Sequence, residues 1–183
     1  APTVDNSAGA GNVPTAGSVK IDGVDSTSAL AGSLPAIRLS ASTAYGFSIV
    51  TWQANNQTVG TVAHGLGVAP DMVVIKNRDS STNAQWVVGH SGFGFNGQGY
   101  LNLNSPFGTN SGSFNNTAPT STVFTVGTDQ TVNLGTNKYI AYCWVEKTGY
   151  SKFSSYEGNN TATGPTVTLG WQPALVMIKN ADG

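Results

Sequence analysis

The stretch Gly67-Val-Ala-Pro-Asp-Met-Val-Val-Ile-Lys-Asn-Arg-Asp79 combines a turn, an apolar run and a polar exit. Gly67 and Pro70 mark the turn, because glycine tolerates positive φ angles and proline fixes its own φ. Four consecutive apolar residues follow at 72–75, a pattern that predicts a strand buried on both faces. The stretch therefore predicts one central strand of a β-rich core.

The same pattern returns near the end of the sequence as Gly170-Trp-Gln-Pro-Ala-Leu-Val-Met-Ile-Lys-Asn-Ala-Asp182. An offset of 103 residues aligns residues 46–79 with residues 149–182 without a gap, and 12 of the 34 pairs are identical. A period near 100 residues indicates tandem whole domains rather than a solenoid, whose repeats are about 20–50 residues long. We therefore expect one complete unit over residues 46–148 and an incomplete second copy over residues 149–183.

Short strand-like segments separated by turns account for most of the remaining sequence. We expect strands at residues 18–21, 36–39, 47–52, 58–62, 72–75, 85–88, 100–103, 121–126, 130–134 and 138–145. No window of 11 or more residues shows the apolar spacing of an amphipathic helix. About eight strands over ~100 residues predict an all-β fold, an antiparallel β-sandwich of the jelly-roll type.

The two ends of the chain lie outside the complete unit. Residues 1–45 are rich in Gly, Ala, Ser and Thr and contain few large apolar residues, so we interpret them as a linker, an attachment segment or the end of a preceding unit. The incomplete second copy leaves strand edges and apolar faces without cover. We expect either that the protein continues beyond residue 183, or that the last strands complete a sheet in the first unit or in a neighbouring chain.

The composition excludes several classes of partner. Charged residues make up only 9% of the chain, against about 25% in an average soluble domain, and the formal net charge is −1. We therefore expect no nucleic-acid partner. No apolar run approaches the ~20 residues that span a bilayer, so we expect no membrane insertion. The single cysteine, Cys143, lies in an apolar run and is expected to be a buried structural thiol, with an intermolecular bridge as the alternative.

Five further motifs accompany the repeat. They are Tyr45-Gly-Phe-Ser48, His64-Gly-Leu-Gly-Val-Ala-Pro70 with the Val-Val-Ile-Lys-Asn run after it, Ala118-Pro-Thr-Ser-Thr-Val-Phe124, Tyr139-Ile-Ala-Tyr-Cys143 and Ser151-Lys-Phe-Ser-Ser-Tyr156. Together they resemble an uncharacterised tandem β-sandwich domain of tailed-bacteriophage tail-fibre and other virion structural proteins. The resemblance covers roughly residues 12–182.

The resemblance implies a non-catalytic virion structural protein, a tail-fibre or other surface protein with a role in adhesion or assembly. It implies a location on the virion surface, outside cells. The implied partners are other virion proteins and further copies of this chain, as in a trimer. Two alternatives stay open: a carbohydrate-binding module of a larger extracellular protein, which would bind a host surface glycan, and a capsid decoration or head-fibre protein.

The sequence contains no recognisable motif of an enzyme, a metal site or a cofactor site. His64 and His90 lie in or beside Gly-rich turns without the further ligands that a metal needs. Asp22 and Asp25 would offer calcium two acidic residues, where a full site needs about six or more ligands. Neither a Gly-x-Ser-x-Gly elbow nor a carboxylate pair for glycoside hydrolysis can be nominated. We therefore expect no catalytic, metal-binding or cofactor-binding residues and no enzyme activity.

A glycine-aromatic segment at residues 89–100 is the best candidate for a ligand or receptor loop. Aromatic faces flanked by amides and hydroxyls suit sugars, and this segment supplies both in Phe93, Phe95, Asn96, Gln98 and Tyr100. The alternative is that Phe93 and Phe95 cap the core. Lys76 and Lys179 share one repeat position, and they are either anion or interface contacts or strand-end lysines whose charge reaches water.

Overall fold

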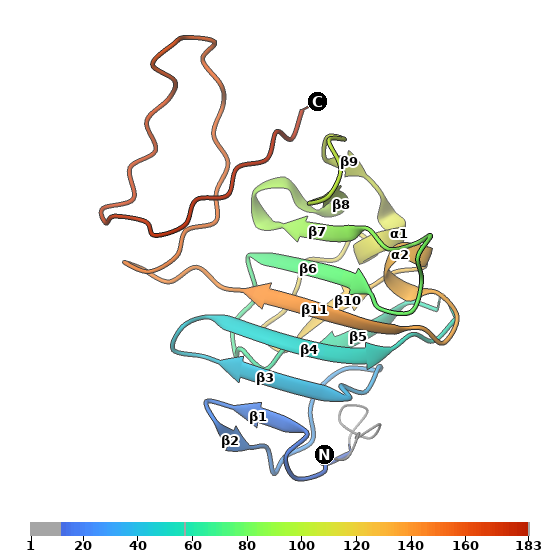
Figure 1. Cartoon of the computed structure of the whole chain (residues 1–183). Helices are drawn as coiled ribbons and strands as arrows, with labels where there is room; N and C mark the ends of the chain where they lie inside the picture. The colour runs from blue at the N-terminus through green and yellow to red at the C-terminus, as the bar shows by residue number, and fades with distance from the viewer. Residues whose placement is uncertain (1–11, 57, 183) are drawn as a thin grey trace.

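The computed structural model describes residues 12–56 and 58–182, and it confirms an all-β fold (Figure 1). Within these residues, nine strands form one large mixed sheet and two strands form a small second sheet. In order across the large sheet, the strands are β2 (Val24–Asp25), β1 (Val19–Ile21), β3 (Arg38–Ser42), β4 (Phe47–Gln53), β11 (Lys138–Trp144), β6 (Met72–Asn77), β7 (Trp86–His90), β8 (Gly94–Tyr100) and β9 (Gly108–Thr109). The pair β1 and β3 is parallel, and the other neighbours are antiparallel.

The small sheet consists of β5 (Gly60–Ala63) and β10 (Val123–Val126), which lie behind the large sheet in Figure 1. Trp52 lies in the core between the sheets, stacked on Tyr139 at 5.5 Å between ring centroids and edge-on to Phe124 at 5.6 Å. These three rings come from β4, β11 and β10, so one aromatic cluster joins the two layers. This arrangement is the predicted β-sandwich.

The stretch around residues 72–77 forms β6, and it is buried on both faces as predicted. Val73 and Ile75 belong to the main core between the sheets. Met72 and Val74 alternate with them and belong to a second, smaller apolar cluster on the other face of the sheet. The continuous apolar run therefore reflects two packed faces, since side chains of a strand alternate between them.

Strand β11, the last strand in the sequence, lies in the middle of the large sheet. It pairs with β4 on one side, from Lys138 opposite Gln53 to Trp144 opposite Phe47. On its other side it pairs with β6. As a result β4 and β6, which follow each other closely in sequence, are held together through a strand that comes more than 60 residues later.

Three local predictions are wrong. Residues 130–134, predicted as a strand, form the short helix α2 (Gln130–Asn133), because the Asp129 side chain accepts a hydrogen bond from the Thr131 N–H at 2.8 Å and caps its first turn. Residues 89–99, predicted as a loop, form the end of β7, the 3₁₀ turn η1 (Ser91–Phe93) and strand β8. Residues 101–103, predicted as part of a strand, form a turn instead.

One further segment adds regular structure that the sequence did not predict, and the strands expected near residues 18–21 and 36–39 join the large sheet, where the sequence interpretation had placed a linker or attachment segment. Residues 104–120, where the sequence predicted no strand, contain β9 and the short helix α1 (Ser111–Phe114), whose Phe114 is fully buried. Residues 19–42, part of the segment interpreted as a linker or the end of a preceding unit, supply β1, β2 and β3 to the large sheet. The sandwich therefore begins well before residue 46. Residues 1–11 lie outside the described residues.

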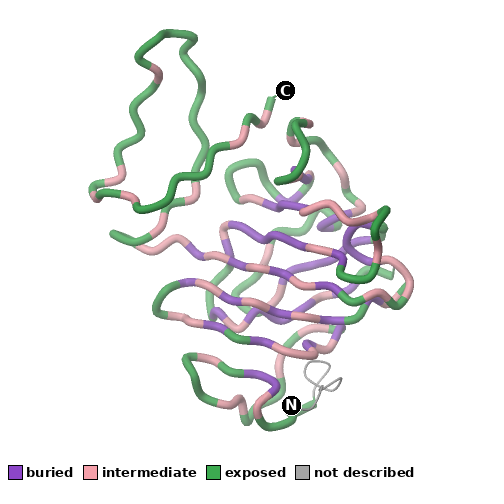
Figure 2. Tube along the Cα trace, viewed as in Figure 1, coloured by how far each residue is buried: buried purple, intermediate pink, exposed green. Residues whose placement is uncertain are grey.

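Residues 149–182 take a different form from the segment that they repeat. The described residues of this range contain no strand or helix, only an isolated bridge between Lys147 and Ser151 at their start. These residues form an extended segment that runs away from the sandwich and is exposed over most of its length (Figure 2). Near residue 181 this segment comes back to the sandwich, where the Phe107 N–H donates to the Ala181 carbonyl at 2.9 Å.

Candidate ligand-binding surface

The five residues proposed from the sequence lie on η1 and β8, and the structure separates them. Phe95 is only 5% exposed and packs edge-on against Phe114, with 5.4 Å between the ring centroids. Gly89 lies beneath both rings, and a Cβ there would come within 2.8 Å of each. Phe95 therefore caps the core, as the alternative interpretation held, and it does not face a ligand.

Gln98 is also buried, and its amide is used inside the protein. Its carbonyl oxygen accepts a hydrogen bond from the Ser113 hydroxyl, and its amide nitrogen donates to the Tyr100 hydroxyl. Burial raises the pKa of Tyr100, which is partly buried beside this pair. These polar groups form hydrogen bonds with one another between β8 and α1, so they are not available to bind a ligand.

Phe93 and Asn96 are the two members of the proposed site that are exposed. The ring of Phe93 stacks on Phe107, with centroids 4.6 Å apart and planes 22° from parallel. Alternation along β8 turns Asn96 to the side opposite Phe95. The five residues thus divide between core and surface, and the prediction of a single binding loop at 89–100 is wrong for Phe95 and Gln98.

A different aromatic surface lies on the face of the large sheet that points away from the small sheet. On β11, Tyr142 and Trp144 alternate with buried residues and so face outward. Tyr142 stacks on Trp86 of β7 at 6.1 Å and on Trp144 at 6.2 Å, and Trp144 lies 5.2 Å from Phe47 of β4. We name Trp86, Tyr142, Trp144 and Phe47 the aromatic row. All four are partly exposed.

The aromatic row ends in a depression, which we name the outer groove. Two open hollows of about 390 and 400 Å³ share Ser42 and Phe47 in their walls, and together they form this groove. One part is lined by Tyr45, Trp144 and Tyr150. The other is lined by Asp22, Gly23, Ser40, Ala41 and Ile49.

Two exposed tyrosines form the rim of the groove. Tyr45 is 62% exposed and Tyr150 is 59% exposed, and their rings lie 5.5 Å apart. Gly46 (φ +63°) lets the chain turn tightly beneath them, since a Cβ there would lie 2.6 Å from the Val145 carbonyl oxygen. The Val145 N–H in turn donates to the Gly46 carbonyl at 2.8 Å. This close approach places the two tyrosines at the same end of β4 and β11.

A carboxylate lies at the opposite end of the outer groove. Asp22, in the turn between β1 and β2, accepts hydrogen bonds from the Thr43 N–H at 2.7 Å and the Thr43 hydroxyl at 2.6 Å. These bonds lower the pKa of Asp22 and keep it negatively charged. The groove therefore combines aromatic rings, hydroxyls and one fixed anion, a mixture that suits a polar ligand with apolar faces, such as a sugar.

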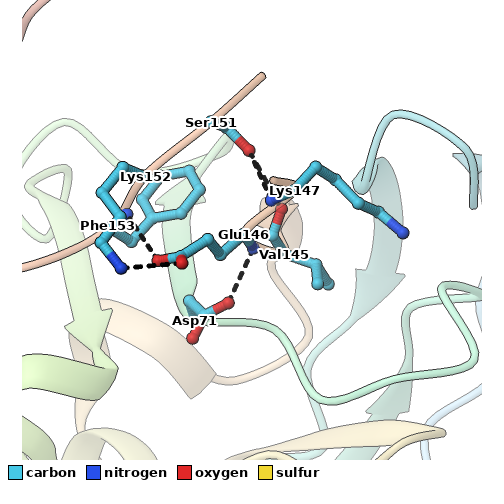
Figure 3. A network of polar contacts seen from close by, with 7 residues as sticks. All are labelled: Asp71, Val145, Glu146, Lys147, Ser151, Lys152 and Phe153. Carbon is cyan, nitrogen blue, oxygen red and sulfur yellow. Dashed lines mark hydrogen bonds and ion pairs between the residues drawn. The ribbon is translucent and has the colours of Figure 1, made fainter. Parts of the chain in front are cut away.

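Figure 3 shows a polar junction between Asp71 and residues 145–153, the segment that carries the rim residue Tyr150. The Glu146 N–H donates to Asp71 at 2.8 Å, and the Glu146 carboxylate pairs with Lys152 at 2.8 Å. Between these contacts, the backbone closes a turn over residues 147–151. The Glu146–Lys152 pair is exposed and contributes little to stability, so the backbone bonds hold the junction.

His64 is a structural residue with a fixed protonation state. It is fully buried, its Nε2–H donates to the Thr120 carbonyl at 3.1 Å, and its Nδ1 accepts from the Leu66 N–H at 3.2 Å. The bond to Nδ1 requires that nitrogen to be unprotonated, so the two bonds together fix the neutral Nε2–H tautomer, and burial lowers the pKa of His64. The structure places His64 directly after β5, beside the Gly-rich turn that the sequence indicated, and buries it there.

His90 and the aspartates considered for a metal also have protein partners. His90 Nδ1 accepts a hydrogen bond from the Gly92 N–H at 3.0 Å. Asp25 pairs with Lys20 and accepts from the Gly17 N–H at 3.0 Å. Over residues 12–56 and 58–182, no three His, Cys, Asp or Glu side chains gather closely enough to hold a metal ion.

Lys76 is the last residue but one of β6, near the strand end as predicted, and its ammonium group is engaged. It donates to the Ala84 carbonyl and lies 5.8 Å from the centre of the Trp86 ring, at one end of the aromatic row. Cys143 is a free thiol and fully buried, which confirms the expected structural thiol. Burial raises its pKa to about 12.

The outer groove could not be found by inspecting any one stretch of sequence. Its walls come from residues near 22, 40–49, 144 and 150, and insertion of β11 beside β4 brings them together. One available signal was the alternation of Tyr142 and Trp144 with small residues, which marks an aromatic outward face.

No helix in the part of the chain that the structure describes is long and apolar enough to cross a membrane.

The chain belongs to the family described as Domain of unknown function (DUF7483), whose match covers residues 16–183. That match includes β1 to β3 and also residues 149–182, so both lie within the family domain. No curated protein and no solved structure matches the chain.

Proposed function

We propose that this chain is a non-catalytic structural protein of a bacteriophage virion, a tail-fibre or related surface protein located outside cells. Its role is adhesion through the outer groove, with a host surface glycan as the ligand and other virion proteins or copies of itself as assembly partners. The phage assignment rests on the motif resemblance, and the adhesive role rests on the groove.

The outer groove with its aromatic row is the observation that carries the adhesive role. Exposed apolar surface that is contiguous and bordered by polar groups is typical of interaction sites. Here four rings in contact lead to two exposed tyrosines, while Asp22 and the serine hydroxyls supply hydrogen-bonding groups. Sugars have apolar ring faces and polar edges, so this surface fits them better than it fits a charged polymer.

The sequence repeat supports a role in an extended assembly. Tandem β-sandwiches joined by short segments make elongated fibres, and many weak sites along a fibre bind a glycan-coated surface by avidity. A carbohydrate-binding module of a larger extracellular protein would use the same groove without a virion. A capsid decoration or head-fibre protein would place the same domain on the head of the particle.

Glycan-array binding of the purified chain tests the adhesive role. We expect retention of oligosaccharides by the wild-type chain, and about fivefold weaker binding by Tyr45→Ala and Tyr150→Ala, since one aromatic contact contributes about 1 kcal/mol. Tyr156→Ala is the matched control, because Tyr156 is an exposed tyrosine outside the groove. Equal losses in all three variants, or no glycan bound by the wild type, would contradict the proposed ligand.

Antibody labelling of purified phage particles tests the virion assignment separately. We expect labelling of tail fibres or of another surface structure. Labelling of the head alone would favour the decoration alternative. Particles that contain none of the chain, combined with glycan binding by the purified chain, would favour the carbohydrate-binding module.

A further inference from the structure

Asp22 is the only charged side chain in the walls of the outer groove, among the residues that the structure describes. The other polar side chains there carry neutral hydroxyls or an indole N–H, and the remaining walls are aromatic or aliphatic. A ligand in this groove therefore meets one negative charge in the walls and no positive one. This asymmetry bears on which sugars the groove accepts.

A tight hairpin turn places this carboxylate. Strands β1 and β2 pair with Ile21 opposite Val24, so Asp22 and Gly23 alone form the loop between them. Their φ angles are +51° and +82°, and a two-residue hairpin turn of type I′ requires positive φ at both positions. The Asp22 N–H donates to the Ala41 carbonyl at 2.8 Å, which holds the turn against β3 beside the groove.

The hydrogen bonds of the carboxylate leave it able to accept another from a ligand. The Thr43 N–H and the Thr43 hydroxyl donate to different oxygens of Asp22, and the Ala44 backbone interacts with the same carboxylate. An ionised carboxylate has about four lone-pair positions and no proton to donate. At least one position therefore stays open, and only a donor can fill it. A hydroxyl or an ammonium group is such a donor, whereas a carboxylate on the ligand is itself only an acceptor.

The neighbouring charges do not reverse the sign of the charge at this site. Lys20 and Asp25, on the same hairpin, form an ion pair with each other. Lys147 adds to the Thr43 hydrogen bonds in lowering the pKa of Asp22, but its side chain packs beside Gly46, outside the walls of the groove. The Asp22 carboxylate therefore determines the charge that a bound sugar meets.

We propose that Asp22 makes the outer groove selective for sugars that present a hydroxyl or an ammonium group, and that it excludes sugars that present a carboxylate. This inference rests on the proposed glycan-binding function and narrows its ligand class. The two hollows meet at Ser42 and Phe47, so one oligosaccharide can lie across both. Its ring faces then lie against Tyr45 and Trp144, and a donor on its edge reaches Asp22. Selectivity of this kind arises from repelling the wrong ligand as well as from binding the right one.

The exposure of Asp22 limits the size of this selectivity. Water and salt screen an exposed charge, so its repulsion of a ligand carboxylate is weaker than it would be in a buried site. We expect a carboxylated sugar to bind about tenfold more weakly than the neutral sugar of the same shape. A higher salt concentration should narrow this gap, since screening acts on the charged ligand and not on the neutral one.

A glycan array of matched oligosaccharides tests the proposal with the whole chain. The members of each set differ only at the exocyclic carbon of the terminal hexose, which carries a hydroxyl, a carboxylate or an amine. We expect the hydroxyl member to bind about tenfold more tightly than the carboxylate member, and the amine member to bind at least as tightly as the hydroxyl member. Carboxylate members that bind as tightly as hydroxyl members, or more tightly, would overturn this inference and leave the glycan-binding function standing. Absence of binding in every set would contradict that function itself.

The Asp22→Asn variant separates a role in selectivity from a role in folding. Asparagine tolerates a positive φ, and its side-chain oxygen can accept from the Thr43 N–H, so we expect little change in the melting temperature. Binding of the hydroxyl member should weaken about threefold while binding of the carboxylate member strengthens about threefold, which removes the preference. Asp25→Asn is the matched control on the same hairpin, outside the groove, and should keep the wild-type ratio. A fall of both members by the same factor in Asp22→Asn keeps the preference and would overturn the proposal.

Discussion

The side-chain nitrogen of Asn77 donates a hydrogen bond to the hydroxyl oxygen of Tyr139 at 2.9 Å, inside the core where both residues are buried. The same hydroxyl accepts from the Leu134 N–H at 2.9 Å and donates to the Gln130 carbonyl at 2.9 Å. One hydroxyl group thus joins β6, β11 and both ends of helix α2. Burial of this group raises the pKa of Tyr139 to about 12, so it stays protonated at ordinary pH.

Removing this hydroxyl should destabilise the sandwich. We expect Tyr139→Phe to lower the free energy of unfolding by about 1–3 kcal/mol, because it leaves buried donors and an acceptor unpaired while keeping the ring. Tyr142→Phe is the matched control, since Tyr142 lies on the same strand but faces outward. Urea denaturation of both variants measures the difference, and equal stabilities would contradict the role given to Tyr139.

Stability should fall as the pH is lowered from 8 to 5. His64 and His90 have pKa values lowered by burial, whereas an unfolded histidine has a pKa of about 6.5. Below that value the unfolded chain binds more protons than the folded chain, so the free energy of unfolding falls as the pH falls towards the folded pKa.

Melting temperatures across this range check the expectation, with His64→Gln expected to weaken the dependence. Asp129 and Glu146 do not interfere, because their pKa values lie below their ordinary values of 3.8 and 4.5. A flat profile for the wild-type chain between pH 8 and 5 would contradict the buried neutral state of His64.

The two equivalent glycines should respond differently to the same substitution. Gly67→Val forces a β-branched residue into a positive φ at the entrance to β6, and we expect a loss of about 1–2 kcal/mol of stability. Gly170→Val should leave the melting temperature unchanged, because residues 149–182 form no strand. Differential scanning fluorimetry separates the two effects. An equal fall in melting temperature would mean that the second copy is already part of the cooperative fold.

Cys143 should be unreactive in the folded chain. The thiolate is the nucleophile, and a pKa of about 12 leaves almost none of it at pH 8. We expect a thiol-alkylating reagent to label the chain quickly in urea and very slowly without it, as mass spectrometry would record. Rapid labelling in native buffer, or a disulfide-linked dimer on a non-reducing gel, would contradict a purely structural thiol.

The sequence predicted those features that local chemistry determines. The apolar runs at 72–75 and within 138–145 predict the strands that the structure shows as β6 and β11. The interpretation of residues 130–134 as a strand was wrong, because the Asp129 cap and its hydrogen bonds to Thr131 outweigh the weak β pattern of so short a segment.

The site depended on information that local patterns do not carry. Phe95 and Phe93 look alike as neighbours of glycine, yet the pleat of β8 and the contact with Phe114 bury one and leave the other exposed. The outer groove requires knowing that Trp144 lies beside Phe47, a pairing between positions nearly 100 residues apart. This pairing can be known only from the order of the strands in the sheet.

The central position of β11 has a consequence for the way in which the domain folds. The strands that flank it are made early by the ribosome, but their shared neighbour is made last, so the middle of the sheet stays open until that strand arrives. Closure then depends on contacts between distant parts of the chain, the kind that makes β-proteins fold slowly and all at once. Until β11 is made, the growing chain exposes two unpaired apolar strands. During this time the chain is prone to aggregation, and the exposed strands are a surface that a chaperone would bind.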